Sequence, residues 1–170
     1  QLTVGESYNL IYDGSVYTTK TVGTYISSAY AEASELGIID GFGTVRETIT
    51  EGDSMKMIDR PSDPWITTGS YITTAQNDTY GTLKSQLTVG ESYNLIYDGS
   101  VYTTKTVGSY ISSAYAEASE LGIIDGFGTV RETITEGDSM KMIDRPSDPW
   151  ITTGSYVTTA QNDTYGTLKS

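Results

Sequence analysis

The chain has 170 residues, no cysteine, no histidine and a formal net charge of −12. This composition excludes disulfides, thiolate metal sites and any mechanism that uses an imidazole base. A chain this acidic is repelled by phosphate backbones and by anionic lipid surfaces. We therefore expect no nucleic-acid partner and, since no apolar run approaches roughly 20 residues, no membrane insertion.

An internal repeat organises the chain. Residues 86–170 repeat residues 1–85 with only two changes, Thr24 to Ser109 and Ile72 to Val157. We therefore expect two tandem units, 1–85 and 86–170. We also expect a permuted structural unit, one that begins and ends at other residues than this 85-residue numbering.

The junction between the copies has no linker. Apolar side chains flank it on both sides, and we expect them to form the contact between repeats, with the junction acting as a rigid splice. These residues are Tyr80, Leu83, Leu87 and Val89.

The first segment, residues 7–22, predicts a β-hairpin. Asp13-Gly14 is a two-residue turn sequence between alternating apolar residues. Such a turn places Leu10 opposite Tyr17 and gathers tyrosines on one face.

The next segment predicts a helix over residues 25–36, because its apolar residues recur at helical spacing. Thr24 would cap the helix, and Gly37 would end it in a left-handed conformation. The spaced residues are Ile26, Ala29, Tyr30, Ala33 and Leu36.

Residues 45–58 fit two patterns. With period two, a strand begins at Val45, turns at Glu51-Gly52-Asp53 and returns through the methionines. With period 3.6, Thr50 caps a short helix. After the prolines at 61 and 64, the segment WITTGSYITTAQ predicts a second hairpin that turns at Gly69-Ser70.

Taken together, hairpin, helix and strand over residues 7–58 resemble the β-grasp (ubiquitin-like) pattern. We therefore expect an α+β fold of two tandem, small, β-rich units. Each unit would contain hairpin, helix and strands, followed by a C-terminal hairpin or splice segment that packs onto the next copy.

A second resemblance lies in AEASELGIIDGFGTVRETITEGDSMKMIDR, which is similar to the S-layer homology motif. In that family a helix ends in a phrase like ELGIIDG, a glycine-bearing loop follows, and an isoleucine-threonine phrase opens a second helix. The resemblance implies attachment to an anionic cell-wall polymer, gripped by an arginine and a glutamate after the threonine. Here Thr50 is followed by Glu51, Gly52 and Asp53.

Candidate sites are few. Carboxylates that cluster in sequence are candidate calcium ligands, namely Asp40, Asp53, Asp59 and Asp63. No other cofactor is expected. Asn77 and Asn162 each begin a glycosylation sequon. Gly41-Phe42-Gly43 lacks the companions of a phosphate-binding glycine motif and predicts a turn.

The near-identity of the copies argues against catalysis, because neither copy has residues that specialise it. We expect a non-enzymatic, structural or adhesive repeat of an extracellular assembly on a cell or virion surface, such as a stalk, an S-layer-like array, a filament or a fibre. Its partners would be neighbouring repeats or other copies of the chain. The alternative is a module that binds carbohydrate or cell-wall glycan in the manner of the S-layer homology family.

Overall fold

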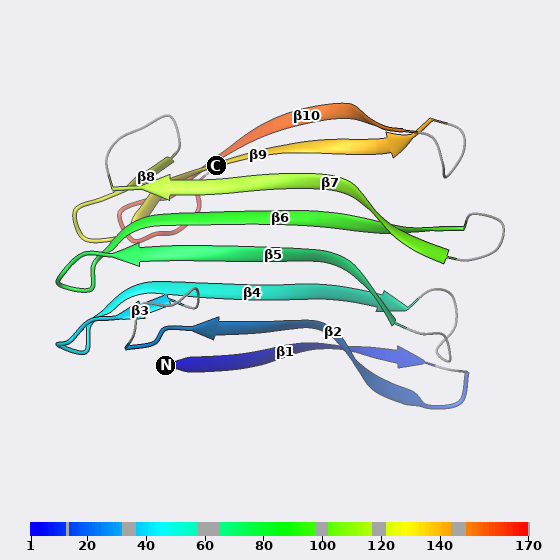
Figure 1. Ribbon diagram of the computed structural model, residues 1–170, viewed down its shortest axis with the longest axis horizontal. Coiled ribbons are helices and arrows are strands. Elements are labelled where there is room, and N and C mark those ends of the chain that lie inside the picture. The colour runs from blue at the N-terminus through cyan, green and yellow to red at the C-terminus, as the bar shows by residue number, and fades with distance from the viewer. Residues whose placement is uncertain are drawn as a thin grey trace.

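The computed structural model is a ten-stranded β-sheet whose strands lie side by side in one layer (Figure 1). The residues that the structure describes are 1–12, 14–31, 37–57, 65–97, 102–116, 122–143 and 149–169. Within them the strands are β1 (Leu2–Tyr12), β2 (Tyr17–Ser28), β3 (Gly37–Ile39), β4 (Val45–Met57), β5 (Trp65–Asn77), β6 (Leu83–Tyr97), β7 (Tyr102–Tyr115), β8 (Gly122–Ile124), β9 (Val130–Met142) and β10 (Trp150–Gln161).

The eight long strands form a meander of four antiparallel hairpins, β1–β2, β4–β5, β6–β7 and β9–β10. Neighbouring hairpins pair through β2 with β4, β5 with β6, and β7 with β9. The short strands β3 and β8 pair with the first residues of β4 and β9. Strand β6 runs without interruption through the repeat junction at Ser85 and Gln86.

The expected α+β fold class is wrong, because every regular element of the described residues is a strand. The first residues of the helix expected over 25–36 instead form the end of β2, which extends to Ser28. Residues 25–28 also fit the two-residue period of a strand. They form a strand because they pair with both β1 and β4. Residues 32–36 lie outside the described residues.

Two further predicted turns are wrong for a shared reason. Strand β4 continues through Glu51-Gly52-Asp53, so neither the turn nor the helix capped by Thr50 forms. Strand β5 likewise continues through Gly69-Ser70. In each case glycine lies inside a strand, where it makes room for a close contact or follows a bulge.

The first hairpin is confirmed, but its register differs from the predicted one. Tyr12 pairs with Tyr17, and Leu10 pairs with Thr19 instead of Tyr17. The shift is an even number of residues, so each side chain keeps its predicted face. The rings of Tyr12 and Tyr17 accordingly meet, with centroids 4.9 Å apart.

All four hairpins share one design. Strands β5 and β7 contain GSYITTA and GSYISSA, and the corresponding segments of β2 and β10 are GTYISSA and GSYVTTA. Just before the glycine of each segment, one extra residue shifts the register as a β-bulge. These bulge residues are Val22, Thr68, Val107 and Thr153.

The sheet has almost no buried core. Among the described residues, the buried apolar side chains are Ala29, Ala114 and Ile124, beside the short strands. The accessible surface is 10853 Å² for a mass of 18.4 kDa, whereas a compact monomer of that mass exposes about 8,200 Å². Both faces of the layer therefore contact solvent over most of their area.

A row of alternating glycine and tyrosine crosses the whole sheet and supplies packing that a second layer would otherwise provide. In order across the strands, it consists of Gly5, Tyr25, Gly52, Tyr71, Gly90, Tyr110, Gly137 and Tyr156. Each tyrosine ring covers the glycine of its own hairpin. A Cβ atom on any of these four glycines would lie only 2.1 to 2.6 Å from the ring, so a larger residue would displace the ring from its position over the strand.

The interior tyrosines of this row should contribute most to stability. Replacing Tyr110, whose phenol pKa is raised by burial and by its neighbours Tyr71 and Tyr156, uncovers the backbone at Gly90. We expect Tyr110→Ala to lower the free energy of unfolding by about 1–3 kcal/mol, measured by urea denaturation. The matched control Tyr80→Ala removes an exposed tyrosine and should change it by less than about 0.5 kcal/mol. Equal effects of the two substitutions would contradict this role for the row.

Candidate functional site

Four equivalent turns lie at one end of the sheet (left in Figure 1). Each has the sequence Asp-x-aromatic-Gly-Thr. They comprise residues 40–44, 78–82, 125–129 and 163–167, and we call them together the turn row. The first three lead into β4, β6 and β9, and the fourth follows β10.

The aspartate closes each turn. In the first turn, Oδ1 of Asp40 accepts hydrogen bonds from the backbone N–H groups of Phe42 (3.0 Å) and Thr44 (2.9 Å). The backbone N–H of Gly43 donates to the carbonyl of Asp40 at 3.0 Å. Gly43 has a φ of 84°, which favours glycine at this position. The other three turns repeat the same bonds.

The backbone hydrogen bonds hold the pKa of each turn aspartate below its ordinary value, with the bond from the last residue of the turn as the largest cause. A cation lies beside each carboxylate. Arg46 pairs with Asp40 at 3.6 Å, Lys84 with Asp78 at 3.4 Å, and Arg131 with Asp125 at 3.6 Å. Lys169 lowers the pKa of Asp163 through its charge. The charge of each turn carboxylate is therefore offset by a nearby cation, within an acidic chain.

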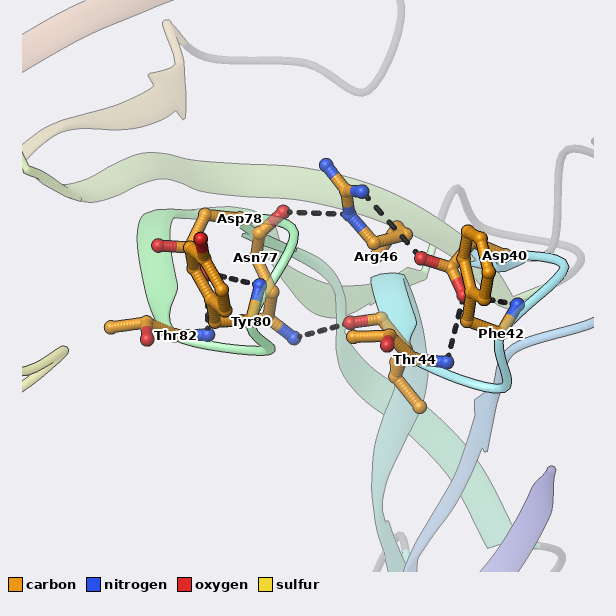
Figure 2. A network of polar contacts seen from close by, with 9 residues as sticks. Asp40, Phe42, Thr44, Arg46, Asn77, Asp78, Tyr80 and Thr82 are labelled. Atoms are coloured by element: carbon orange, nitrogen blue, oxygen red, sulfur yellow. Dashed lines mark hydrogen bonds and ion pairs between the residues drawn. The ribbon is translucent and has the colours of Figure 1, made fainter.

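Successive turns contact one another. The γ-methyl of Thr44 lies 3.5 Å from where a Cβ on Gly81 would be, and the next two contacts of this kind measure 3.0 and 3.6 Å. Figure 2 shows two further links between the first two turns. Asn77 donates its side-chain N–H to the carbonyl of Val45 at 3.0 Å, and Arg46 donates Nε–H to the carbonyl of Asn77 at 3.3 Å. The four turns therefore form one continuous edge, in which each turn contacts the next.

The aromatic residue of each turn projects into solvent. The exposed fractions are 99% for Phe42, 90% for Tyr80, 91% for Phe127 and 91% for Tyr165. Figure 2 shows the rings of Phe42 and Tyr80 at equivalent places on neighbouring turns. Large apolar side chains this exposed, repeated four times along one edge, mark a candidate interaction site.

The face opposite the tyrosine rings carries two regular rows. One is aliphatic, interrupted by two glutamates, and contains Val4, Ile26, Glu51, Ile72, Val89, Ile111, Glu136 and Val157. The other alternates carboxylate and hydroxyl groups and contains Glu6, Thr24, Asp53, Ser70, Glu91, Ser109, Asp138 and Ser155. Alternation keeps like charges from lying directly opposite on neighbouring strands.

Both differences between the copies fall in these two rows. The change from Thr24 to Ser109 keeps a hydroxyl in the carboxylate-hydroxyl row. The change from Ile72 to Val157 keeps a β-branched aliphatic residue in the aliphatic row. The chemical pattern of the face is therefore the same in both copies.

The calcium candidates do not come together where the structure describes them. Asp40 lies in the first turn, whereas Asp53 lies well along β4 and pairs with Thr24 and Ser70. Asp59 and Asp63 lie outside the described residues. Within the described part of the chain, no group of three or more acidic side chains is placed to hold a metal ion.

The sequon asparagines have structural contacts of their own. The side-chain amide of Asn77 donates to Val45, and that of Asn162 donates to the carbonyl of Val130 at 3.0 Å. A glycan on either nitrogen would compete with these bonds.

The four predicted junction residues separate into two groups. Leu83, Leu87 and Val89 lie on β6, which pairs with β5 of the first copy and β7 of the second. Tyr80 belongs to the turn row, and its side chain points into solvent.

Sequence reasoning identified the turn at Gly41-Phe42-Gly43, which is confirmed, but missed the row. The signal was present in the sequence: DGFGTVR and DTYGTLK share an aspartate, an aromatic residue, glycine, threonine, an aliphatic residue and a cation at the same spacing. The aspartate, glycine, threonine and cation of this pattern each make contacts in the turns, whereas the aromatic ring is exposed.

The turn aspartates predict loss of stability in acid. Their folded pKa lies below the ordinary 3.8, so the stabilisation is fully present above that pH and is lost as pH falls through the lowered value. The urea concentration at the midpoint of unfolding should therefore decrease as the pH is lowered through this range. Asparagine at positions 40, 78, 125 and 163 should reduce the pH dependence, because its oxygen still accepts but does not titrate. The charge-matched comparison is Asp40→Asn with Asp125→Asn against Asp53→Asn with Asp138→Asn, and an equal reduction in the two double variants would contradict the assignment.

Comparison with protein-family models, with curated proteins and with solved structures finds no match to this chain. The interpretation of the turn row and of the sheet therefore depends on the residues and geometry described above.

Proposed function

We propose that this protein is a non-enzymatic structural repeat module of an extracellular assembly, in which each copy of the repeat lengthens one continuous sheet. The observation that carries the proposal is strand β6 (Leu83–Tyr97), which spans the junction between copies. Its first three residues belong to the first copy, and the rest belong to the second. The two copies therefore share a strand and are not joined by a tether.

The hairpin pattern supports the same function. Because the four hairpins share one design, the β5–β6 pairing that joins the copies repeats the β2–β4 and β7–β9 pairings within them. A further copy in a longer polypeptide could pair with β10 in the same way that β6 pairs with β5, since β10 repeats β5 with one change. On this proposal the structural unit is permuted relative to the 85-residue frame.

The chemistry of the surface fits an exposed, non-catalytic setting. The sequence has no histidine or cysteine to serve as a base or nucleophile, and its charge of −12 favours solubility of a thin sheet. No helix in the described part of the chain is suited to crossing a bilayer. The proposed location is a cell or virion surface, and the proposed partners are neighbouring repeats and other copies of the chain.

Tandem chains of two, three and four copies test this function directly. We expect each copy to add about 19 Å to the sheet, four strands at ~4.8 Å, measured by small-angle scattering. Unfolding should become more resistant to urea as copies are added, since each interface adds a stabilising term. Copies that unfold independently, or native material that shows no repeat order by electron microscopy, would contradict the proposal.

The shared strand gives a second prediction. A flexible Gly-Ser linker inserted between Ser85 and Gln86 should lower the free energy of unfolding by about 1–3 kcal/mol, because it interrupts β6 beside its partners on β5 and β7. The same linker between Gly14 and Ser15, at a hairpin end, should cost less than about 1 kcal/mol. If the insertion at the junction leaves the free energy of unfolding unchanged, the copies are separate domains joined by a tether.

A further inference from the structure

The four exposed rings of the turn row are not needed to close the turns. Closure uses the aspartate, the backbone and the glycine, as the bonds around Asp40 show. Yet Phe42, Tyr80, Phe127 and Tyr165 keep at least 90% of their surface in water. Exposing an apolar ring forfeits the gain of burying it, so repetition of this arrangement at one edge indicates a ligand that covers the rings.

The rings are spaced regularly. Each turn occupies the width of two chain segments, and successive turns contact each other through threonine and glycine. Neighbouring rings are therefore about 10 Å apart, twice the separation of strands in a sheet. A ligand that covers all four must be extended and must repeat its apolar surface at this interval.

The described surface between the rings is polar, and the charge of its turn carboxylates is offset. Threonine and glycine separate the rings, and each turn carboxylate has a cation beside it. Protein interfaces usually bury a contiguous apolar centre, and the described residues between the rings do not form one. Because the turn carboxylates already have cations beside them, a charged polymer gains little at the turns themselves. An uncharged ligand with alternating apolar and hydroxyl-bearing surfaces fits better.

We propose that the turn row binds an extended, neutral polysaccharide of β-1,4-linked pyranose sugars. The disaccharide of such a chain has a length close to the spacing of the rings, so each ring stacks on one sugar of each successive disaccharide. The flat apolar face of an aromatic side chain matches the C–H face of a pyranose. Hydroxyl groups of the sugar meet the threonines and the phenol groups of Tyr80 and Tyr165. This inference goes beyond the proposed structural function and does not rest on it.

Retention of the full 170-residue chain on microcrystalline cellulose and on chitin tests the site, with soluble cellohexaose as competitor. We expect saturable retention that cellohexaose reduces. Each single variant, such as Phe42→Ala, should weaken retention about threefold, the size of one aromatic contact. Replacing all four rings by alanine should abolish retention, because linked weak contacts multiply. Tyr80→Phe with Tyr165→Phe should keep most of it.

The control removes four exposed tyrosines from the other end of the sheet. Tyr12, Tyr17, Tyr97 and Tyr102 are each more than half exposed, and their alanine variant should be retained like the unchanged chain. Circular dichroism establishes that each variant keeps its sheet. The proposal is overturned if the unchanged chain binds neither solid, if the fourfold turn variant binds as well as the unchanged chain, or if the control variant loses retention to the same extent.

Discussion

The structure depends on tyrosine rings that pack against the backbone of a neighbouring strand at glycine. A single sheet has no opposite layer to bury its side chains, so any cover for a large residue must come from its own layer. Placing Gly90 beside Tyr110 provides this cover, because the absent Cβ leaves room for the ring to lie flat over the strand. Glycine in a strand is ordinarily weakening, and an aromatic residue placed across from it restores packing.

This arrangement constrains the residues of the row. A residue larger than glycine at position 52 would collide with Tyr71 of the same hairpin, and Tyr71 is in turn followed by Gly90 on the next strand. Each position is therefore constrained by the strands on both sides. The two differences between the copies lie on the other face and keep the chemical class of their rows.

The sequence predicted a β-rich protein, the first hairpin and the turn at Gly41-Phe42-Gly43, because these depend on local signals. It did not predict a single all-β layer. Residues 25–28 fit both helical and strand spacing, and the choice was made by strands β1 and β4, far away in the sequence. Gly69-Ser70 was interpreted as a turn because a bulge and a turn share the same glycine signal. The turn row was missed because its four turns are distant in sequence and come together only when the hairpins pair side by side.

The near-identity of the two copies has a consequence for folding. Residues 1–12 and 86–97 are identical, so β5 meets the same sequence whether its neighbour is β6 or a first strand from another molecule. Side chains therefore do not identify the correct partner. The order of the sheet is encoded instead in connection length, because the short turn after β5 brings β6 into place at a small entropic cost. At high concentration that kinetic advantage shrinks, and exchange of whole hairpins between chains becomes the natural folding error of this architecture.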